Sequence, residues 1–257
     1  MKIAVCIKQV VTREWQVRVN DDRTWVKDGD ASWELNEPDA YALEEALRLK
    51  EKHGGEVVVI SAGPSRATQV IREALARGAD RAIHVEGDVF ATADAFVAAE
   101  ALAAALKDEQ IDLVLTGLQS DDQGFAQVGV ILAEKLGMAH STIIMEVQVD
   151  GSTLRVKREL EGGWFQWISM PLPAVLTIQS GINQLRYATL KGIMAAKKKE
   201  IRTIQSANVP AFQSAARQRI TSIYMPQKQK QTRMITGTPA EAAKELVRAL
   251  REEARVF

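Results

Sequence analysis

Short apolar runs alternate with amphipathic segments along roughly the first 140 residues. The apolar runs have the length and composition of buried strands, and they lie at 3–7, 57–61, 82–85 and 113–116. Apolar residues recur at helical spacing over 41–53, 65–77, 92–108 and 126–136. Gly54, Gly78 and Gly137 follow three of these segments as stop signals. Because strands that alternate with helices form right-handed crossovers, this pattern predicts an α/β fold with a parallel sheet covered on both faces.

The pattern changes after about residue 140. Two strand-like segments, 143–149 and 154–160, flank the run Asp150-Gly151-Ser152-Thr153. Since Asp-Gly adopts turn conformations readily, we expect an antiparallel hairpin here. A further strand candidate covers 174–178 and is introduced by Pro171 and Pro173. The parallel core is therefore expected to carry an antiparallel extension.

From about residue 200 the strong periodicity is lost. Residues 206–231 are rich in Gln, Ser, Ala and Arg and are interrupted by Pro210 and Pro226. Such a segment is either disordered or an extended arm that lies on another chain.

A last helix is well marked near the end of the sequence. Thr238 is a candidate N-cap, Pro239 occupies the first helical position and Glu241 the third. The apolar stripe that follows consists of Ala243, Leu246, Val247 and Leu250. We expect one α/β domain at 1–204 and, at 205–257, an arm and helix that dock on a partner subunit.

Composition excludes several classes of protein. Among the 257 residues, Lys plus Arg and Asp plus Glu both number 33, so no bulk field favours nucleic acid or an anionic membrane. Cys6 is the sole cysteine, which rules out a disulfide framework and a cysteine-based metal cluster. The N-terminus enters a strand pattern at once, and no apolar run approaches the ~18 residues of a membrane span. We expect a cytoplasmic protein with no direct membrane insertion.

The loops after the strands are the candidate binding site, because a doubly wound sheet binds ligands beyond the carboxyl ends of its strands. The loop 117–124 contains Gly117 and Gly124 and runs into a helix near Ala126. Unpaired N–H groups and the dipole of a helix N-terminus suit a phosphate. Gln119, Ser120 and Gln127 offer hydrogen bonds, while Asp121 and Asp122 contact ribose hydroxyls or cap the helix on this interpretation. An ordinary strand-to-helix turn fits the same residues equally well.

Catalytic constellations do not stand out. The sequence has neither the G-x-G-x-x-G fingerprint nor the G-x-x-x-x-G-K-[ST] loop, which disfavours classical NAD binding and P-loop hydrolysis. His53, His84 and His140 are scattered, and no pair of them has metal-ligand spacing. Cys6 and His84 are better interpreted as structural residues of strands.

One further stretch, 183–199, joins apolar residues to a cluster of lysines. It is either a short amphipathic helix with a solvated basic end or a docking site with an apolar anchor ringed by positive charge.

This stretch closely resembles the signature of electron transfer flavoprotein β subunits. The family has segments like R-E-[ILV]-[DE]-G-G, L-P-A-V-x-T and N-x-x-R-Y-A-[TS]-L-x-x-I-M-x-A-K-K-K. The chain has Arg158-Glu159-Leu160-Glu161-Gly162-Gly163, then Leu172-Pro173-Ala174-Val175-Leu176-Thr177, then the run from Asn183 to Lys199. The order and spacing agree, and the resemblance covers about residues 1–205.

The resemblance implies a Rossmann-like fold of the adenine nucleotide α-hydrolase-like type and an electron carrier subunit rather than an enzyme. In this family a larger α subunit holds the redox FAD, and the β subunit buries an AMP with a structural role. The implied nucleotide-binding residues are Cys6, Lys8, Asn36, Ala62, Gly63, Gln119, Ser120, Asp121, Asp122, Gln123, Gly124, Phe125, Ala126, Gln127, Val128, Gly129 and Val130.

The resemblance also implies partners: the α subunit, acyl-CoA or other dehydrogenases as donors, and a quinone oxidoreductase as acceptor. Glu159 matches the acidic residue that pairs with an α-subunit arginine, and Leu190 matches the tip of the loop that inserts into acyl-CoA dehydrogenases. The full partner-binding set is Glu159, Arg186, Tyr187, Leu190, Ile193, Met194, Lys197, Lys198 and Lys199.

One departure leaves an alternative open. Relatives that bind a second FAD and bifurcate electrons from NADH tend to have Asp-Gly-Asp-Thr-Ala-Gln where this chain has Asp121-Asp122-Gln123-Gly124-Phe125-Ala126-Gln127. We therefore expect AMP, with a second FAD as the alternative. An ATP-using enzyme of the same fold is a rival from another class, but its Ser-Gly-Gly-x-Asp-Ser loop is replaced here by Lys8-Gln9-Val10-Val11.

Overall fold

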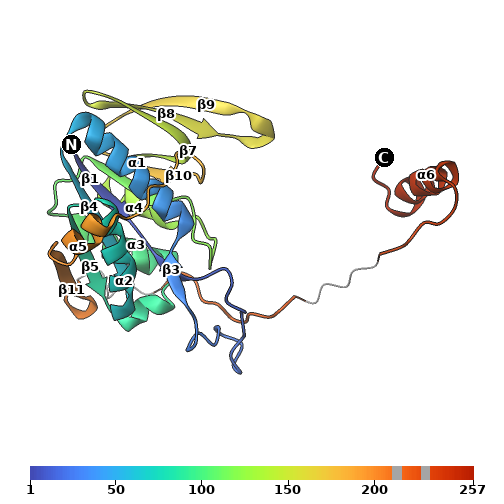
Figure 1. The fold of residues 1–257 in the computed structure, drawn as a ribbon, viewed down its shortest axis with the longest axis horizontal. Coiled ribbons are helices and arrows are strands. Elements are labelled where there is room, and N and C mark those ends of the chain that lie inside the picture. The colour runs from blue at the N-terminus through green and yellow to red at the C-terminus, as the bar shows by residue number, and fades with distance from the viewer. Residues whose placement is uncertain (210–215, 227–231) are drawn as a thin grey trace.

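A computed structural model describes residues 1–209, 216–226 and 232–257 (Figure 1). Its centre is a nine-stranded sheet in the order β11-β5-β4-β1-β6-β10-β7-β8-β9. All pairings from β11 to β7 are parallel, and β8 and β9 continue the sheet antiparallel. The strands are β1 (Lys2–Cys6), β4 (Glu56–Gly63), β5 (Arg81–Glu86), β6 (Leu113–Gly117), β7 (Ala139–Asp150), β8 (Thr153–Glu159), β9 (Phe165–Pro171), β10 (Ala174–Ile178) and β11 (Ile201–Gln205). The prediction of a Rossmann-like α/β fold with an antiparallel extension is confirmed.

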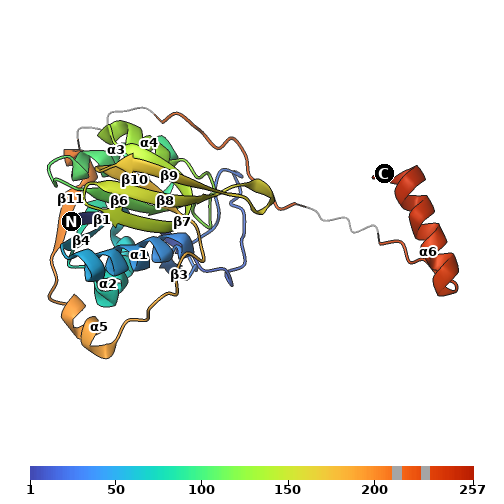
Figure 2. The same ribbon diagram turned by 90° about the horizontal axis from the view of Figure 1, so that it is seen from above.

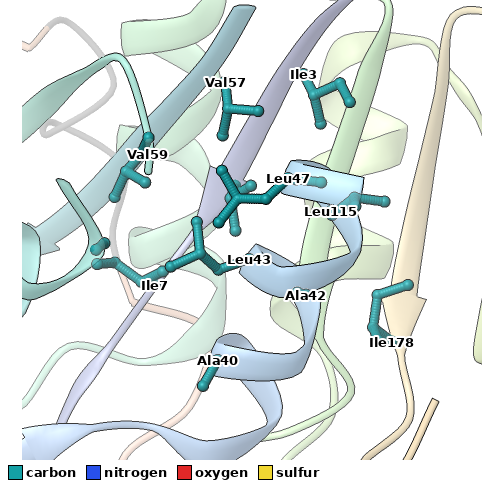
Figure 3. Close-up of a cluster of buried hydrophobic side chains, with 14 of the residues drawn as sticks. Ile3, Ile7, Ala40, Ala42, Leu43, Leu47, Val57, Val59, Leu115 and Ile178 are labelled. Carbon is teal, nitrogen blue, oxygen red and sulfur yellow. The ribbon is translucent and has the colours of Figure 1, made fainter. Parts of the chain in front are cut away.

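Helices cover both faces of the sheet. Figure 2 shows α1 (Glu37–His53) and α2 (Thr68–Arg77) on one face, and α3 (Ala95–Leu106) and α4 (Val128–Leu136) on the other. Each layer has its own apolar core. On the α1 face, Leu43 and Leu47 pack on the fully buried strand residues Ile3, Val57 and Leu115 (Figure 3). The buried strands are nearly continuous apolar runs because they are covered on both faces.

The helix boundaries differ from the predicted ones for local reasons. α1 begins four residues before the predicted start, since Pro38 in its first turn fits a helix N-terminus. α3 begins at Ala95, where the Asp94 side chain accepts a hydrogen bond from the N–H of Val97. α4 begins two residues later than predicted because Ala126 has a left-handed backbone, with φ +54°.

The antiparallel hairpin is confirmed as β7 and β8, joined at Gly151 and Ser152. β7 starts before the predicted residue 143 and bends there, since Ile143 has φ +59° and the register shifts just beyond it. The third strand of this extension, β9, was not predicted.

Three further strands were also missed. β2 (Gln9–Val11) and β3 (Trp33–Leu35) pair in a separate antiparallel sheet beside the strand ends. β11 follows α5 (Leu190–Ala196) and pairs with β5 at the far edge of the main sheet. β11 ends at Gln205, and Val209 is buried in the core cluster on the α3 face of the sheet.

The C-terminal helix α6 (Pro239–Arg248) lies apart from the α/β domain in both views (Figures 1 and 2). Its start is as predicted: Thr238 and Glu241 form a reciprocal capping box, with Pro239 in the first turn. None of its residues is buried, and Leu246 and Val247 are about half exposed. Among the described residues of the arm, 216–226 form no helix or strand, and the predicted arm positions at 210–215 and 227–231 lie outside the described residues.

Candidate functional site

The strand order of the main sheet reverses at β1. β4, the next strand of this sheet along the chain, pairs with one side of β1, and β6 pairs with the other side. The carboxyl ends of β1 and β6 are where a ligand binds in such a sheet. The loops predicted from the sequence do meet there.

Two side chains from the start of α1 hold these loops in place. The Asp39 carboxylate accepts hydrogen bonds from the N–H of Lys8 (2.8 Å) and of Gly117 (2.9 Å). The Asn36 amide donates to the carbonyl of Gln119 (3.0 Å) and accepts from the N–H of Asp121 (2.9 Å). Gly117 is required at this point, since a Cβ there would lie 2.4 Å from the Asp39 carboxylate. Asp39 and Asn36 therefore fix the positions of the loops that follow β1 and β6.

Burial dominates the acid–base properties of this region. It raises the pKa of Asp39 to about 7, against the opposing effect of the N–H donors of Lys8 and Gly117. Burial, with a smaller contribution from Asp39, also raises the pKa of the Cys6 thiol. Cys6 is consequently an unreactive core residue, as expected.

Lys8 crosses the site from the end of β1 to the loop after β6. Its ammonium group lies 2.7 Å from the Asp122 carboxylate and 3.1 Å from the side-chain oxygen of Gln123. The Ser120 hydroxyl lies further away, at 3.4 Å. The Lys8 ammonium group can bind an anionic ligand, but it then gives up its ion pair with Asp122.

The N-terminus of α4 offers backbone donors to the same site. Gln127 occupies the N-cap position but its side chain makes no capping hydrogen bond, and the left-handed Ala126 precedes it. Gly129, in the first turn, lies so close to the strands that a Cβ would meet Thr177 at 2.5 Å and the Thr116 hydroxyl at 2.8 Å. An uncapped first turn has free N–H groups, which suits a phosphate.

These elements enclose a pocket with about 840 Å³ of empty space, part of it open to solvent. The predicted residues that line it are Cys6, Lys8, Asn36, Ala62, Gln119, Ser120, Gln123, Phe125, Ala126, Gln127, Val128 and Gly129. Gly63, Asp121 and Asp122 instead line a neighbouring hollow, and Val130 lines a third. Gly124 supports the loop through its N–H bond to Ser120.

Sequence reasoning missed one wall of the pocket. This wall is formed by residues just before and within α3, among them Phe90, Asp94, Ala98 and Leu102. The alanine-rich stretch predicted a helix, but nothing in its periodicity indicated that its N-terminus faces the site. Asp39 was missed as well, although a carboxylate in the first turn of a helix at a strand end is a recognisable signal.

The second hollow adjoins the pocket. The two share Lys8, Ala62, Phe90, Gln123 and Phe125 as lining residues. Three tryptophans, Trp15, Trp25 and Trp33, line the second hollow, together with residues 219–223 of the arm.

The predicted docking stretch forms a loop and the short helix α5, which packs on α2. Tyr187 is 91% exposed, Leu190 84% and Met194 62%, so the stretch presents an apolar surface to solvent. Gly192 permits the contact with α2, because a Cβ there would lie 2.3 Å from the carbonyl of Ala76. Ile193 is also exposed.

The charged residues of this stretch divide into two groups. Arg186 is bound within the chain, through ion pairs with Glu44 (2.8 Å) and Glu51 (2.5 Å) on α1. The Lys199 ammonium donates to the carbonyls of Leu75 and Ala79 at the end of α2. Lys197 and Lys198 are exposed. The stretch therefore combines internal anchors with an outward apolar and basic surface.

Glu159 lies elsewhere, at the end of β8, where its carboxylate accepts a hydrogen bond from the Gln179 amide.

Across the described residues no group of His, Cys, Asp and Glu is placed to hold a metal ion. Within the same part of the chain no helix is long and apolar enough to cross a membrane.

Comparison with known proteins gives a consistent result. A family model described as the electron transfer flavoprotein domain matches residues 24–209. The chain is 39% identical to the electron transfer flavoprotein subunit beta of Methylophilus methylotrophus, over 98% of each protein. It is 35% identical to the subunit of the same name from Bacillus subtilis, over the full length of both. The human subunit is 35% identical, over all of this chain and 99% of the human protein.

Proposed function

This chain belongs to the electron transfer flavoprotein family, and from that premise we propose that it is the β subunit of a heterodimer that carries electrons on FAD. The full-length similarity to subunits named beta supports this assignment. On this proposal the α subunit holds most of the FAD, which accepts electrons from a dehydrogenase and passes them to a quinone oxidoreductase. The chain itself is an electron-transfer subunit, and no catalytic residue is assigned to it.

The pocket between β1 and β6 is proposed to hold AMP as a structural nucleotide. The single observation that carries this is the uncapped N-terminus of α4, which opens into a pocket at the switch point. Its first-turn N–H groups suit one phosphate, with Lys8 as the neighbouring cation. The apolar wall formed by Phe90, Ala98 and Leu102 suits the flat face of a purine.

A second FAD in place of AMP is the alternative, and one observation favours it. The pocket opens into the hollow that Trp15, Trp25 and Trp33 line, so a dinucleotide has room to extend beyond the first phosphate. AMP remains the preferred ligand because Lys8 and Asp122 are paired at the border between the two spaces.

Identification of the bound nucleotides tests both proposals. The purified heterodimer is denatured, and the released nucleotides are separated and identified by mass spectrometry. We expect one AMP and one FAD per heterodimer. Two FAD molecules and no AMP would support the alternative, and a heterodimer without FAD would contradict the electron-carrier role.

The stretch 183–199 is proposed to recognise the partner dehydrogenase. Its exposed side chains, Tyr187, Leu190, Ile193 and Met194, form an apolar surface flanked by Lys197 and Lys198. An apolar anchor with a basic rim is the arrangement of a binding hot spot with electrostatic steering. Glu159, on the hairpin, is proposed as the contact to the α subunit.

A further inference from the structure

One segment of the arm lies on the α/β domain next to the nucleotide pocket. Its backbone is attached at its beginning to Asp94, whose Oδ2 accepts hydrogen bonds from the N–H of Arg217 (2.6 Å) and of Gln218 (2.8 Å). At its other end the N–H of Ile223 donates to the carbonyl of Arg23 (2.7 Å). We call residues 216–223 the strap.

The strap attaches to the wall of the pocket itself. Asp94 lines the nucleotide pocket, and its other oxygen, Oδ1, caps the α3 helix through Val97. Strap residues 216–220 line a hollow together with Ala93, Gln123 and Phe125, which also line the nucleotide pocket. Residues 219–223 line the tryptophan hollow. The strap therefore borders several of the hollows that adjoin the pocket.

The contacts to Asp94 are strong ones for a loop. Burial alone would raise the pKa of Asp94, but the N–H groups of Val97, Gln218 and Arg217 outweigh it and hold that pKa below its usual range. Hydrogen bonds to a charged acceptor contribute more than neutral ones. In addition, the Arg217 guanidinium lies over the Phe96 ring of α3, 5.0 Å from its centroid.

We propose that the strap closes the nucleotide pocket and that the bound nucleotide in turn holds the strap in place. The proposal rests on the proposed nucleotide site. A nucleotide stabilises the α3 wall, which holds Asp94 in place for the strap. A fixed strap in turn hinders the nucleotide from leaving. Since coupling between sites is reciprocal, the nucleotide also orders the strap.

Asp94→Asn removes the contacts of Asp94 with the strap and keeps its contact with the N-terminus of α3. The asparagine oxygen still caps α3 through Val97, but its amide nitrogen no longer accepts the N–H groups of Arg217 and Gln218. Ile223→Pro removes the attachment at the other end without touching α3. Asp88→Asn is the matched control, because it removes one negative charge from an exposed position nearby.

The experiment measures the release rate of radiolabelled AMP from the full-length chain after dilution into unlabelled AMP. We expect release to be at least about tenfold faster in Asp94→Asn and in Ile223→Pro, the loss of about 1.4 kcal/mol, and unchanged in Asp88→Asn. Hydrogen exchange at the Arg217 and Gln218 amides should slow when AMP is added to the wild type.

The outcomes separate the two proposals. If the wild type binds no AMP, the nucleotide assignment fails, and the strap's role in closing the pocket fails with it. If AMP binds and leaves all variants at the wild-type rate, the strap proposal alone is overturned. Thermal unfolding of each variant shows whether α3 remains intact, and Ile223→Pro decides the matter if Asp94→Asn does not fold.

Discussion

Asp39 is the residue on which the geometry of the proposed nucleotide site depends most directly. It lies in the first turn of α1, is almost completely buried, and binds the backbone at the ends of both β1 and β6. Its two carboxylate oxygens bind the backbone N–H groups at the carboxyl ends of these two paired strands, where the pocket opens. A carboxyl group in this position is held near its titration point at neutral pH, since burial raises its pKa to about 7.

The pKa of Asp39 predicts a pH dependence of stability. Because its pKa is raised from 3.8 to about 7 by folding, its contribution is fully present below pH 3.8 and is lost as pH rises towards 7. The ligand-free wild type should therefore lose stability relative to Asp39→Asn across this window, by on the order of 4 kcal/mol. Urea unfolding of both proteins between pH 4 and 8 measures the difference. Parallel stability profiles would contradict the prediction.

Arg186 provides a second prediction at this scale. Its guanidinium binds Glu44, which is 5% exposed, and Glu51, which is 60% exposed. Arg186→Met leaves the buried Glu44 with only Arg48 as a cation, so we expect a loss of about 2 kcal/mol, less than for a fully buried pair. Glu51→Gln removes only the exposed partner and should cost less than about 1 kcal/mol. If urea unfolding gives the same loss in the free energy of unfolding for both variants, burial does not determine how much these ion pairs contribute to stability.

At the scale of elements, the sequence predicts those strands and helices whose burial pattern is regular. The strands β1, β4, β5, β6 and β10 are apolar runs buried on both faces, and a run of that kind is visible without any knowledge of its neighbours. β9 has the opposite character. Phe165 and Trp167 are exposed beside Lys157 and Arg155, with ring contacts at 4.1 and 4.4 Å, so its pattern does not resemble a core strand.

The candidate site is predictable to the extent that it follows strands. The loop after β6 could be located because glycines and polar residues follow a buried run. The α3 wall and the strap could not, since Asp94 meets Arg217 and Gln218 across more than 120 positions of sequence. Such contacts depend on tertiary structure that no local pattern encodes.

The element α5 carries the third prediction. Leu190→Ala removes an 84% exposed side chain from the proposed dehydrogenase surface. We expect a loss of about 2 kcal/mol of binding, or roughly thirtyfold in affinity, with the α–β pairing unchanged. The rate of electron transfer is measured against the concentration of the partner dehydrogenase. Wild-type efficiency from an intact heterodimer would show that Leu190 is not an anchor.

The lysines next to α5 should divide according to their contacts. Neutralising Lys197 and Lys198 should slow association and flatten its salt dependence, because exposed rim charges act through steering. Lys199→Met should instead lower thermal stability, since its ammonium group binds the carbonyls of Leu75 and Ala79. Stopped-flow association at several salt concentrations, together with thermal unfolding, distinguishes these effects.

On the scale of the whole molecule, the described structure has two unequal parts. The α/β domain contains every buried residue that the structure describes, and α6 contains none. α6 nevertheless has a complete capping box and an apolar stripe, which a helix exposed on all sides does not need. We propose that it is the element that docks on the α subunit.

Deletion of residues 232–257 provides the fifth prediction. The thermal midpoint of the isolated chain and its AMP content should not change, because α6 packs on nothing in the α/β domain. Pairing with the α subunit should weaken strongly. Analytical ultracentrifugation of the mixed subunits measures the pairing, and hydrogen exchange on α6 in the full-length chain should slow only when the α subunit is added. Undiminished pairing would exclude α6 as a docking element.

The positions of the tryptophans make their intrinsic fluorescence a probe of two different regions of this protein. Of the five tryptophans in the chain, Trp15, Trp25 and Trp33 line the hollow beside the proposed nucleotide pocket, while Trp164 and Trp167 are exposed, just before β9 and within it. Indole emission is quenched when a flavin ring comes within energy-transfer range, and it shifts to the blue when water is excluded. Emission from the first group therefore follows events at the pocket, and emission from the second follows any chain that covers β9. Replacing Trp164 and Trp167 with phenylalanine would leave only the first signal, so that ligand binding at the pocket is recorded on its own without an attached dye.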